Sequence, residues 1–146
     1  MELKELREKR DQYIQYINVE HHANLDALCN QEGIDFMKAK IAFDKKVQTA
    51  NDEYEQDLID IHNLFPSGQD PRRKANEKLA NHDYTCKVDK AREEYYLEKS
   101  RIHGRTVRLR EIEKLELKLT KNHLAEVNSK IDAILATKPS KNNPTM

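Results

Sequence analysis

The chain has 146 residues, of which 37% are hydrophobic and 36% are charged, with 26 basic and 26 acidic side chains. An ordinary globular domain has roughly 45–50% apolar and about 25% charged residues, so this composition argues against a compact globule with a broad core. The balanced charge provides no overall field that would draw the whole chain to nucleic acid or to an anionic membrane.

The first predicted element is a long helical arm over residues 2–65. Only three glycines and four prolines occur in the whole chain, which favours long uninterrupted helices. Apolar residues recur at three- and four-residue steps, the period of a helix with one buried stripe. The stripe is weaker near the N-terminus, at Ile14, Ile17, His21, Leu25 and Leu28, than farther on, at Phe43, Val47, Ala50, Tyr54, Leu58, Ile61 and Phe65.

The only concentrated turn signal follows at residues 66–70, which begin with Pro66, contain a Ser-Gly pair and are followed by Pro71. Asp70 is a good N-cap residue, and Pro71 suits the first position of a helix because its missing N–H has no partner there anyway. We therefore expect the first arm to end near Phe65 and the second helix to begin at Pro71.

The second predicted arm covers residues 71–138 and again shows the helix period. Its stripe slips in phase near residues 117–119, which predicts a local stutter. Residues 1–138 are expected to form a single helical domain, and residues 139–146 a flexible C-terminal tail. The predicted fold is all-α, a long antiparallel helical hairpin with coiled-coil seams.

The glycines suggest a register for the two arms. If the hairpin turns at Gly68, residue n faces roughly residue 137 − n, which places Gly33 opposite Gly104 and Tyr54 close to Tyr84. Glycine costs about 1 kcal/mol inside a helix, so two facing glycines suggest a shared bend or break. The chain would then contain four helices, which either form a bent, extended hairpin or fold into a four-helix bundle. We favour the hairpin because the seams are narrow. The four helices would cover roughly 2–31, 34–65, 71–103 and 105–138.

The charges divide between the two arms. Residues 1–65 carry eight basic and fourteen acidic side chains, a net of −6, and residues 66–146 carry a net of +6. Arms of opposite charge attract one another when they lie side by side, so the division favours internal pairing over a partner.

A basic stripe lies in the second arm. Arg101, Arg105 and Arg108 lie on one helix face, and Arg110 follows them. These four residues are candidates for contact with phosphate or another anionic partner. The alternative, which we favour, is that they pack beside acidic residues of the first arm that the register places opposite, Asp26, Glu32 and Asp35.

The turn offers a second candidate surface. Leu64 and Phe65 form a small apolar patch beside the basic residues Arg72 and Arg73, and the tip of a hairpin differs in chemistry from its shaft. These residues are candidates for contact with another protein. The alternative is that the apolar pair only covers the turn.

The sequence provides little support for catalysis. His21 and His22 point about 100° apart on a helix, and no H-x-x-x-H pair is present. Cys29 and Cys86 form no C-x-x-C motif, and neither is expected to form a disulfide or to act as a nucleophile. We expect no enzyme activity, cofactor, metal or small-molecule substrate. Without a signal peptide or a membrane span, a cytoplasmic location is expected, or a virion or host cytosol if a phage encodes the chain.

The predicted function is that of an adaptor or assembly protein that contacts another protein, or a second copy of itself, through its shaft or its tip. Nucleic-acid binding through the basic stripe is the alternative, and membrane binding is not expected. In length and hairpin plan the chain resembles the FliJ/YscO family of secretion-ATPase stalk proteins. The resemblance spans both arms but matches no motif, so it identifies no site residue. A phage assembly or host-directed accessory protein would show the same plan.

Overall fold

The computed structural model describes residues 2–137, and these residues form helices with no strand among them. The elements in chain order are α1 (Leu3–Gln15), the π-helix η1 (Tyr16–Glu20), α2 (His21–Leu64) and α3 (Pro71–Thr137). This confirms the all-α prediction. The predicted tail, residues 139–146, lies outside the described residues.

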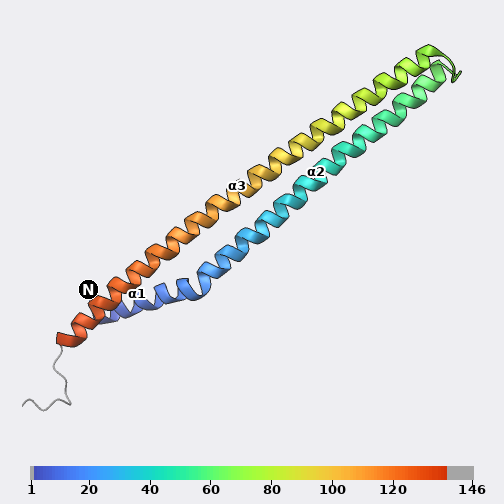
Figure 1. Cartoon of the computed structure of the whole chain (residues 1–146). Helices are drawn as coiled ribbons and strands as arrows, with labels where there is room; N and C mark the ends of the chain where they lie inside the picture. The colour runs from blue at the N-terminus through green and yellow to red at the C-terminus, as the bar shows by residue number, and fades with distance from the viewer. Residues whose placement is uncertain (1, 138–146) are drawn as a thin grey trace, which may run out of the picture. The chain divides into compact units, whose positions relative to one another are not determined.

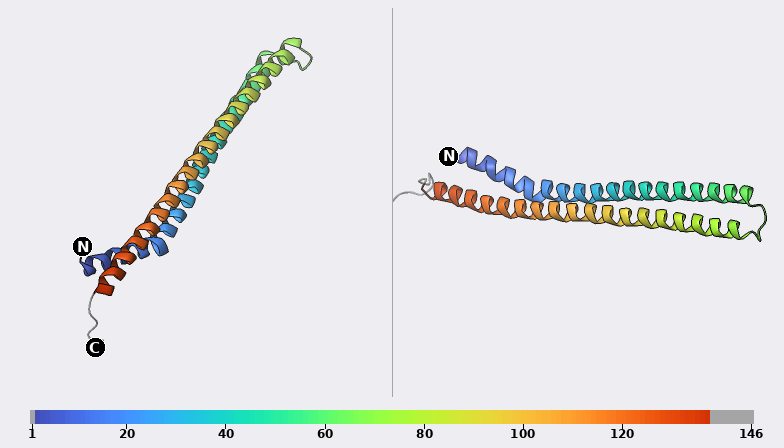
Figure 2. Two further views of the ribbon diagram at one scale, coloured as in Figure 1. Left: turned by 60° about the vertical axis from the view of Figure 1, so that its left-hand side comes forward. Right: turned by 90° about the horizontal axis from the view of Figure 1, so that it is seen from above.

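Contacts divide the chain into two compact units, and both α2 and α3 contribute residues to each unit. Unit 1 contains residues 2–31 and 106–137, and unit 2 is Glu32–Arg105. In unit 2, α2 and α3 run antiparallel as a helical hairpin that reverses at the turn (Figure 1). In unit 1, α1, η1 and the first turns of α2 run antiparallel to the last part of α3 (Figure 2).

Aromatic pairs mark the register of unit 2. The rings of Tyr54 and Tyr84 stack with their centroids 5.0 Å apart, and so do those of Phe43 and Tyr95. In each pair the residue numbers sum to 138, so the predicted register is confirmed in this unit. Small buried residues alternate with these rings and allow the two helices to approach closely; in unit 2 they are Ala39, Ala50, Ala80 and Ala91.

The turn begins and ends where the sequence predicts. Helix α3 starts at Pro71, and the backbone N–H of Arg72 donates to the Asp70 carboxylate at 2.9 Å, which is the expected N-cap bond. Within the turn, the backbone N–H of Asp70 donates to the Ser67 carbonyl at 3.1 Å.

A small apolar cluster holds α1 in unit 1. Leu6, which is 2% exposed, packs with Val127 and Ile131 of α3, and the partly buried Leu3, Tyr13 and Ile134 surround them. Tyr13 takes the seam position here, whereas Ile14, which the sequence placed on the stripe, is exposed.

The predicted division of the arms at Gly33 and Gly104 is wrong, and so is a four-helix bundle that reverses at these residues. Both α2 and α3 continue through their glycines. A glycine ends a helix most effectively in a left-handed conformation, and no glycine of residues 2–137 has a positive φ. The cost of one glycine is small beside the seam packing on either side of it, such as the burial of Ile102.

The helix irregularity lies instead at η1, which interrupts the N-terminal arm at Tyr16–Glu20. Four successive seam residues, Tyr13, Ile17, His21 and Leu25, are spaced by four. A four-residue step in an α-helix overshoots a full turn by about 40°, so three such steps would turn the stripe by about 120°. A π-helix contains more residues per turn and absorbs this drift, so all four residues stay on the seam.

The predicted stutter in α3 corresponds to a change from one apolar face of the helix to another. Leu117 and Leu124 are partly buried and Val127 is buried toward the seam of unit 1. A second set of apolar residues, Ile112, Leu115 and Leu119, lies on another face and is exposed. The apparent phase slip near residues 117–119 therefore arises because two stripes overlap in the sequence.

Candidate functional site

A cluster of polar side chains in unit 1 converges on Glu113. The Oε1 atom of Glu113 accepts from Tyr16 Oη at 2.6 Å, from His21 Nδ1 at 3.0 Å and from Asn24 Nδ2 at 3.2 Å. The His21 residue is only 6% exposed, and the Glu113 side chain is 13% exposed. The π-helix ends directly before His21, so the irregular turn and the cluster are adjacent.

The environment shifts the acidity of two members of this cluster. Burial by itself raises the pKa of Glu113, but the hydrogen bonds from Tyr16, Asn24 and His21 outweigh burial and hold the pKa below its ordinary value. Burial, together with the hydrogen bond to Glu113, raises the pKa of the Tyr16 phenol. The carboxylate is therefore ionised at neutral pH and the phenol keeps its proton.

Sequence reasoning missed this cluster, although a signal for it was present. The predicted register pairs Glu113 with residue 24, and a carboxylate on the seam opposite Asn24 and His21 is a candidate for a polar network. The contribution of Tyr16 could not be predicted, because the π-helix changes the helical phase of the residues before His21 by a fraction of a turn. In a regular α-helix Tyr16 would not lie on the seam.

The four predicted basic residues differ in the contacts that they make within their own units. Arg101 donates two hydrogen bonds to Glu98 of the same helix, at 2.6 and 3.0 Å, and Asp35 lies close enough to raise its pKa further. Arg110 in unit 1 donates to Cys29 Sγ at 2.9 Å. The side chains of Arg105 in unit 2 and Arg108 in unit 1 make no hydrogen bond or ion pair with any residue of the described range 2–137.

The predicted acidic neighbours of these arginines are only partly engaged with them. Asp35 interacts with Arg101, as the register suggested. Glu32 instead faces His103, with its Oε2 atom 3.6 Å from His103 Nδ1. Across the seam of unit 2, Lys87 pairs with Glu53 at 2.6 Å, but Lys46 of the acidic arm pairs with Glu94 of the basic arm. Charge matching across the seam therefore runs in both directions.

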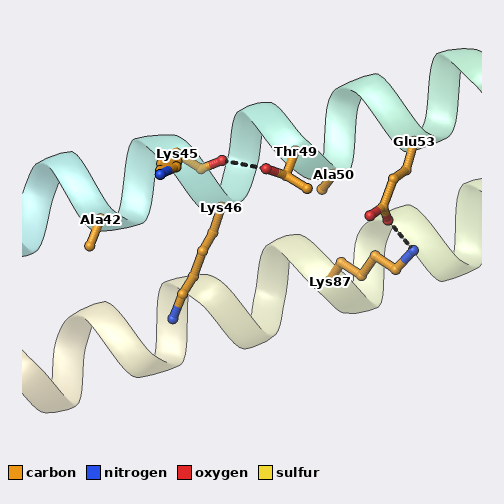
Figure 3. Close-up of a pocket in the computed structure, with 7 residues that line it drawn as sticks. All are labelled: Ala42, Lys45, Lys46, Thr49, Ala50, Glu53 and Lys87. Carbon is orange, nitrogen blue, oxygen red and sulfur yellow. Dashed lines mark hydrogen bonds and ion pairs between the residues drawn. The ribbon is translucent and has the colours of Figure 1, made fainter.

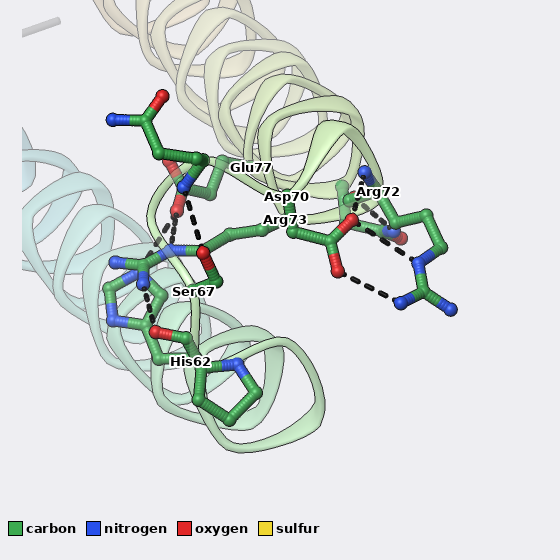
Figure 4. Close-up of polar contacts among 9 residues, drawn as sticks. His62, Ser67, Asp70, Arg72, Arg73 and Glu77 are labelled. Carbon is green, nitrogen blue, oxygen red and sulfur yellow. Dashed lines mark hydrogen bonds and ion pairs between the residues drawn. The ribbon is translucent and has the colours of Figure 1, made fainter.

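Two of the candidate residues at the turn, Arg72 and Arg73, make several polar contacts (Figure 4). Arg72 donates from Nη2 to Asp70 Oδ2 at 2.9 Å, and its guanidinium lies 4.9 Å from the centre of the Phe65 ring. The hydrogen bond from Arg72 holds the pKa of Asp70 below its ordinary value. Leu64 remains 72% exposed beside them. The Phe65 ring is thus covered by Arg72, whereas Leu64 is open to a partner.

Arg73 links the two helices at the turn. Its guanidinium donates to the Pro66 carbonyl at 3.1 Å and to Glu77 Oε1 at 2.8 Å, and the same carboxylate oxygen lies 3.1 Å from His62 Nε2 (Figure 4). The hydrogen bond from Arg73 lowers the pKa of Glu77. Arg73 therefore stabilises the turn, which makes it a poorer candidate for partner contact than the sequence suggested.

A shallow groove of about 450 Å³ lies along unit 2 (Figure 3). Short side chains and lysines line the groove, and Lys87 donates a hydrogen bond to Glu53. Its lining residues are Ala42, Lys45, Lys46, Thr49, Ala50, Glu53 and Lys87.

Two exposed apolar triplets lie on outer helix faces, one in each unit. In unit 2, Ile34, Met37 and Ile41 of α2 are exposed at i, i+3 and i+7, with Met37 at 66%. In unit 1, the triplet is Ile112, Leu115 and Leu119 of α3. This spacing is that of a helix–helix contact seam.

The chemistry-bearing side chains are otherwise dispersed. Cys29 and Cys86 are free and exposed, and Cys86 Sγ lies 3.6 Å from His82 Nε2, a contact that the i, i+4 spacing could have revealed. Within residues 2–137, no three His, Cys, Asp or Glu side chains are placed to hold a metal ion. Over the same residues, no helix combines the length and apolar character needed to cross a bilayer. Comparison with protein-family models, curated proteins and solved structures finds no significant match.

Proposed function

We propose that the chain is a non-catalytic adaptor or assembly protein that binds other proteins through the outer faces of its helices. The observation that carries this proposal is the exposed triplet Ile34, Met37 and Ile41. The opposite face of α2 already packs on the seam of unit 2 through Phe43 and Tyr54. A helix with a second apolar stripe at heptad spacing has the pattern of one that pairs with a further helix.

Several features complete the proposed role. The helices pair as coiled coils, and the exposed Leu64 at the turn adds an apolar contact point next to Arg72. The protein acts in the cytoplasm, or in a virion or the host cytosol if a phage encodes it. It requires no cofactor and transforms no substrate.

The double variant Met37→Lys/Ile41→Lys is expected to lose its protein partner. Two charges would be buried without counterions in the centre of the contact, so capture should fall on the order of tenfold or more. The measurement is affinity capture with the full chain from its native source, followed by quantitative mass spectrometry. Ile59→Lys is the matched control, because Ile59 is also exposed but lies 18 residues beyond Ile41 on the same helix face, so this variant should retain the partner if the contact is centred on the triplet.

Two results would contradict the proposal. Equal recovery of the same protein by the double variant would show that this face is not the contact. If the wild-type chain captures no protein that an unrelated helical protein does not also capture, the adaptor role itself is refuted.

Nucleic-acid binding is the second candidate, because Arg105 and Arg108 each present a guanidinium that is unpaired within residues 2–137. If each contacts a phosphate, Arg105→Ala and Arg108→Ala should each reduce the slope of log affinity against log salt by about one. Fluorescence anisotropy with labelled single- and double-stranded oligonucleotides measures this slope. Arg92→Ala, whose guanidinium pairs with Asp89, is the control. No binding at low salt would exclude this function.

A further inference from the structure

The last part of α3 carries a continuous heptad stripe that its own unit does not cover. Starting at Arg108, the stripe proceeds by alternating four- and three-residue steps. Its apolar centre is Ile112, Leu115 and Leu119, which are 53%, 61% and 51% exposed. The seam of unit 1 uses other residues of the same helix, among them Val127 and Ile131. The complete stripe is Arg108, Ile112, Leu115, Leu119, Asn122 and Glu126.

The two ends of this stripe carry opposite charges. Arg108 lies at one end and Glu126 at the other, and both are exposed. Neither side chain makes a hydrogen bond or an ion pair with another residue in the range 2–137. An apolar stripe with a free cation at one end and a free anion at the other is complementary to its own reversed copy.

Pairing geometry distinguishes the two possible orientations of such a copy. In an antiparallel pair centred between Leu115 and Leu119, each leucine faces the other leucine of the second copy. The same alignment sets Arg108 opposite Glu126 at both ends, and Ile112 opposite Asn122. A parallel pair would instead oppose Arg108 to Arg108 and Glu126 to Glu126, and like charges repel.

We propose that a second copy of this chain docks antiparallel on this stripe of unit 1, which makes the protein a two-fold symmetric dimer. The inference rests on the proposed function in one respect, that the chain acts by contact between helix faces. At the edge of the contact Lys118 lies near its own counterpart in the second copy, which is a like-charge contact between exposed side chains. Glu116 lies near its own counterpart, which is unfavourable but exposed and therefore screened by salt.

The first test is the oligomeric state of the full chain by sedimentation velocity and equilibrium. The wild type should form dimers with micromolar or tighter affinity, and Leu115→Lys should weaken dimerisation on the order of tenfold or more, because it places two lysines in the centre of the contact. Leu135→Lys, on the same helix and 46% exposed, is the control and should dimerise normally. A monomer at all concentrations up to several hundred micromolar would overturn the proposal, as would a dimer that Leu115→Lys does not weaken.

The second test is a charge exchange, which also fixes the orientation. Arg108→Glu alone and Glu126→Arg alone should each weaken the dimer several-fold, since each creates two like-charge contacts. The double variant Arg108→Glu/Glu126→Arg should restore the wild-type affinity. Failure of the double variant to recover, with all variants helical by circular dichroism, would refute antiparallel pairing. A monomer that still captures its partner through Met37 and Ile41 would refute the dimer and leave the adaptor role standing.

Discussion

Replacing Glu113 by alanine is expected to destabilise unit 1 by about 3 kcal/mol, because it leaves the buried His21, the partly buried Tyr16 and the exposed Asn24 without their shared acceptor. Tyr16, His21 and Asn24 all bond to the same oxygen of Glu113, and His21 has almost no access to water. Glu113→Gln keeps the shape of the side chain and one carbonyl acceptor, so it should cost about 1–2 kcal/mol.

Urea unfolding of the full chain measures this loss of stability. Hydrogen exchange of residues 3–31 shows whether the loss is located in unit 1. Glu111→Ala is the matched control, since the side chain is 62% exposed and pairs with the neighbouring Lys114 of the same helix. Its cost should stay within about 0.5 kcal/mol. If Glu113→Ala proved as mild as Glu111→Ala, the cluster would contribute nothing to the stability of unit 1.

The same carboxylate predicts a pH dependence with a definite sign. Its pKa in the folded chain is below the ordinary value, so the unfolded chain binds its proton more tightly. The stabilisation is therefore complete above the ordinary glutamate pKa of about 4.3 and is lost as pH falls through the folded pKa. The wild type should lose this part of its stability below about pH 4.3, and Glu113→Gln should not.

Deletion of Glu8 is expected to cost about 3 kcal/mol, whereas deletion of Val19 should cost less than about 1 kcal/mol. Removing Glu8 rotates the preceding residues by about 100° and takes Leu6 away from Val127 and Ile131. Removing Val19 takes one residue out of the π-helix. The seam residues are then spaced alternately by four and three positions, as in a regular α-helix, and Leu6 stays in place.

Both deleted residues are exposed, which makes the two variants a matched pair. Thermal unfolding gives the stability of each variant, and hydrogen exchange of residues 3–15 shows whether α1 remains packed. Equal destabilisation by the two deletions would mean that η1 does not serve to correct the phase of the seam. A stable Val19 deletion with a protected α1 is the expected outcome.

Much of the fold could be predicted because it depends on local residues. Asp70 and Pro71 define the start of α3 through N-cap chemistry, which acts within one turn of helix. The position of the turn then determines the register by counting alone, so the stacking of Tyr54 on Tyr84 followed from it. The candidate site was less accessible, because no motif marks a surface that functions through shape and charge.

The sequence by itself determined that the chain is helical, where it turns and which residues of unit 2 face each other. These properties follow from periodicity and capping, which are short-range. Only the tertiary structure decided that Gly33 and Gly104 stay helical, because seam packing outweighs the cost of one glycine. It also decided that the N-terminal arm contains a π-helix and that Tyr16, His21 and Asn24 gather on Glu113. Those outcomes depend on contacts between residues about ninety positions apart, which no local pattern contains.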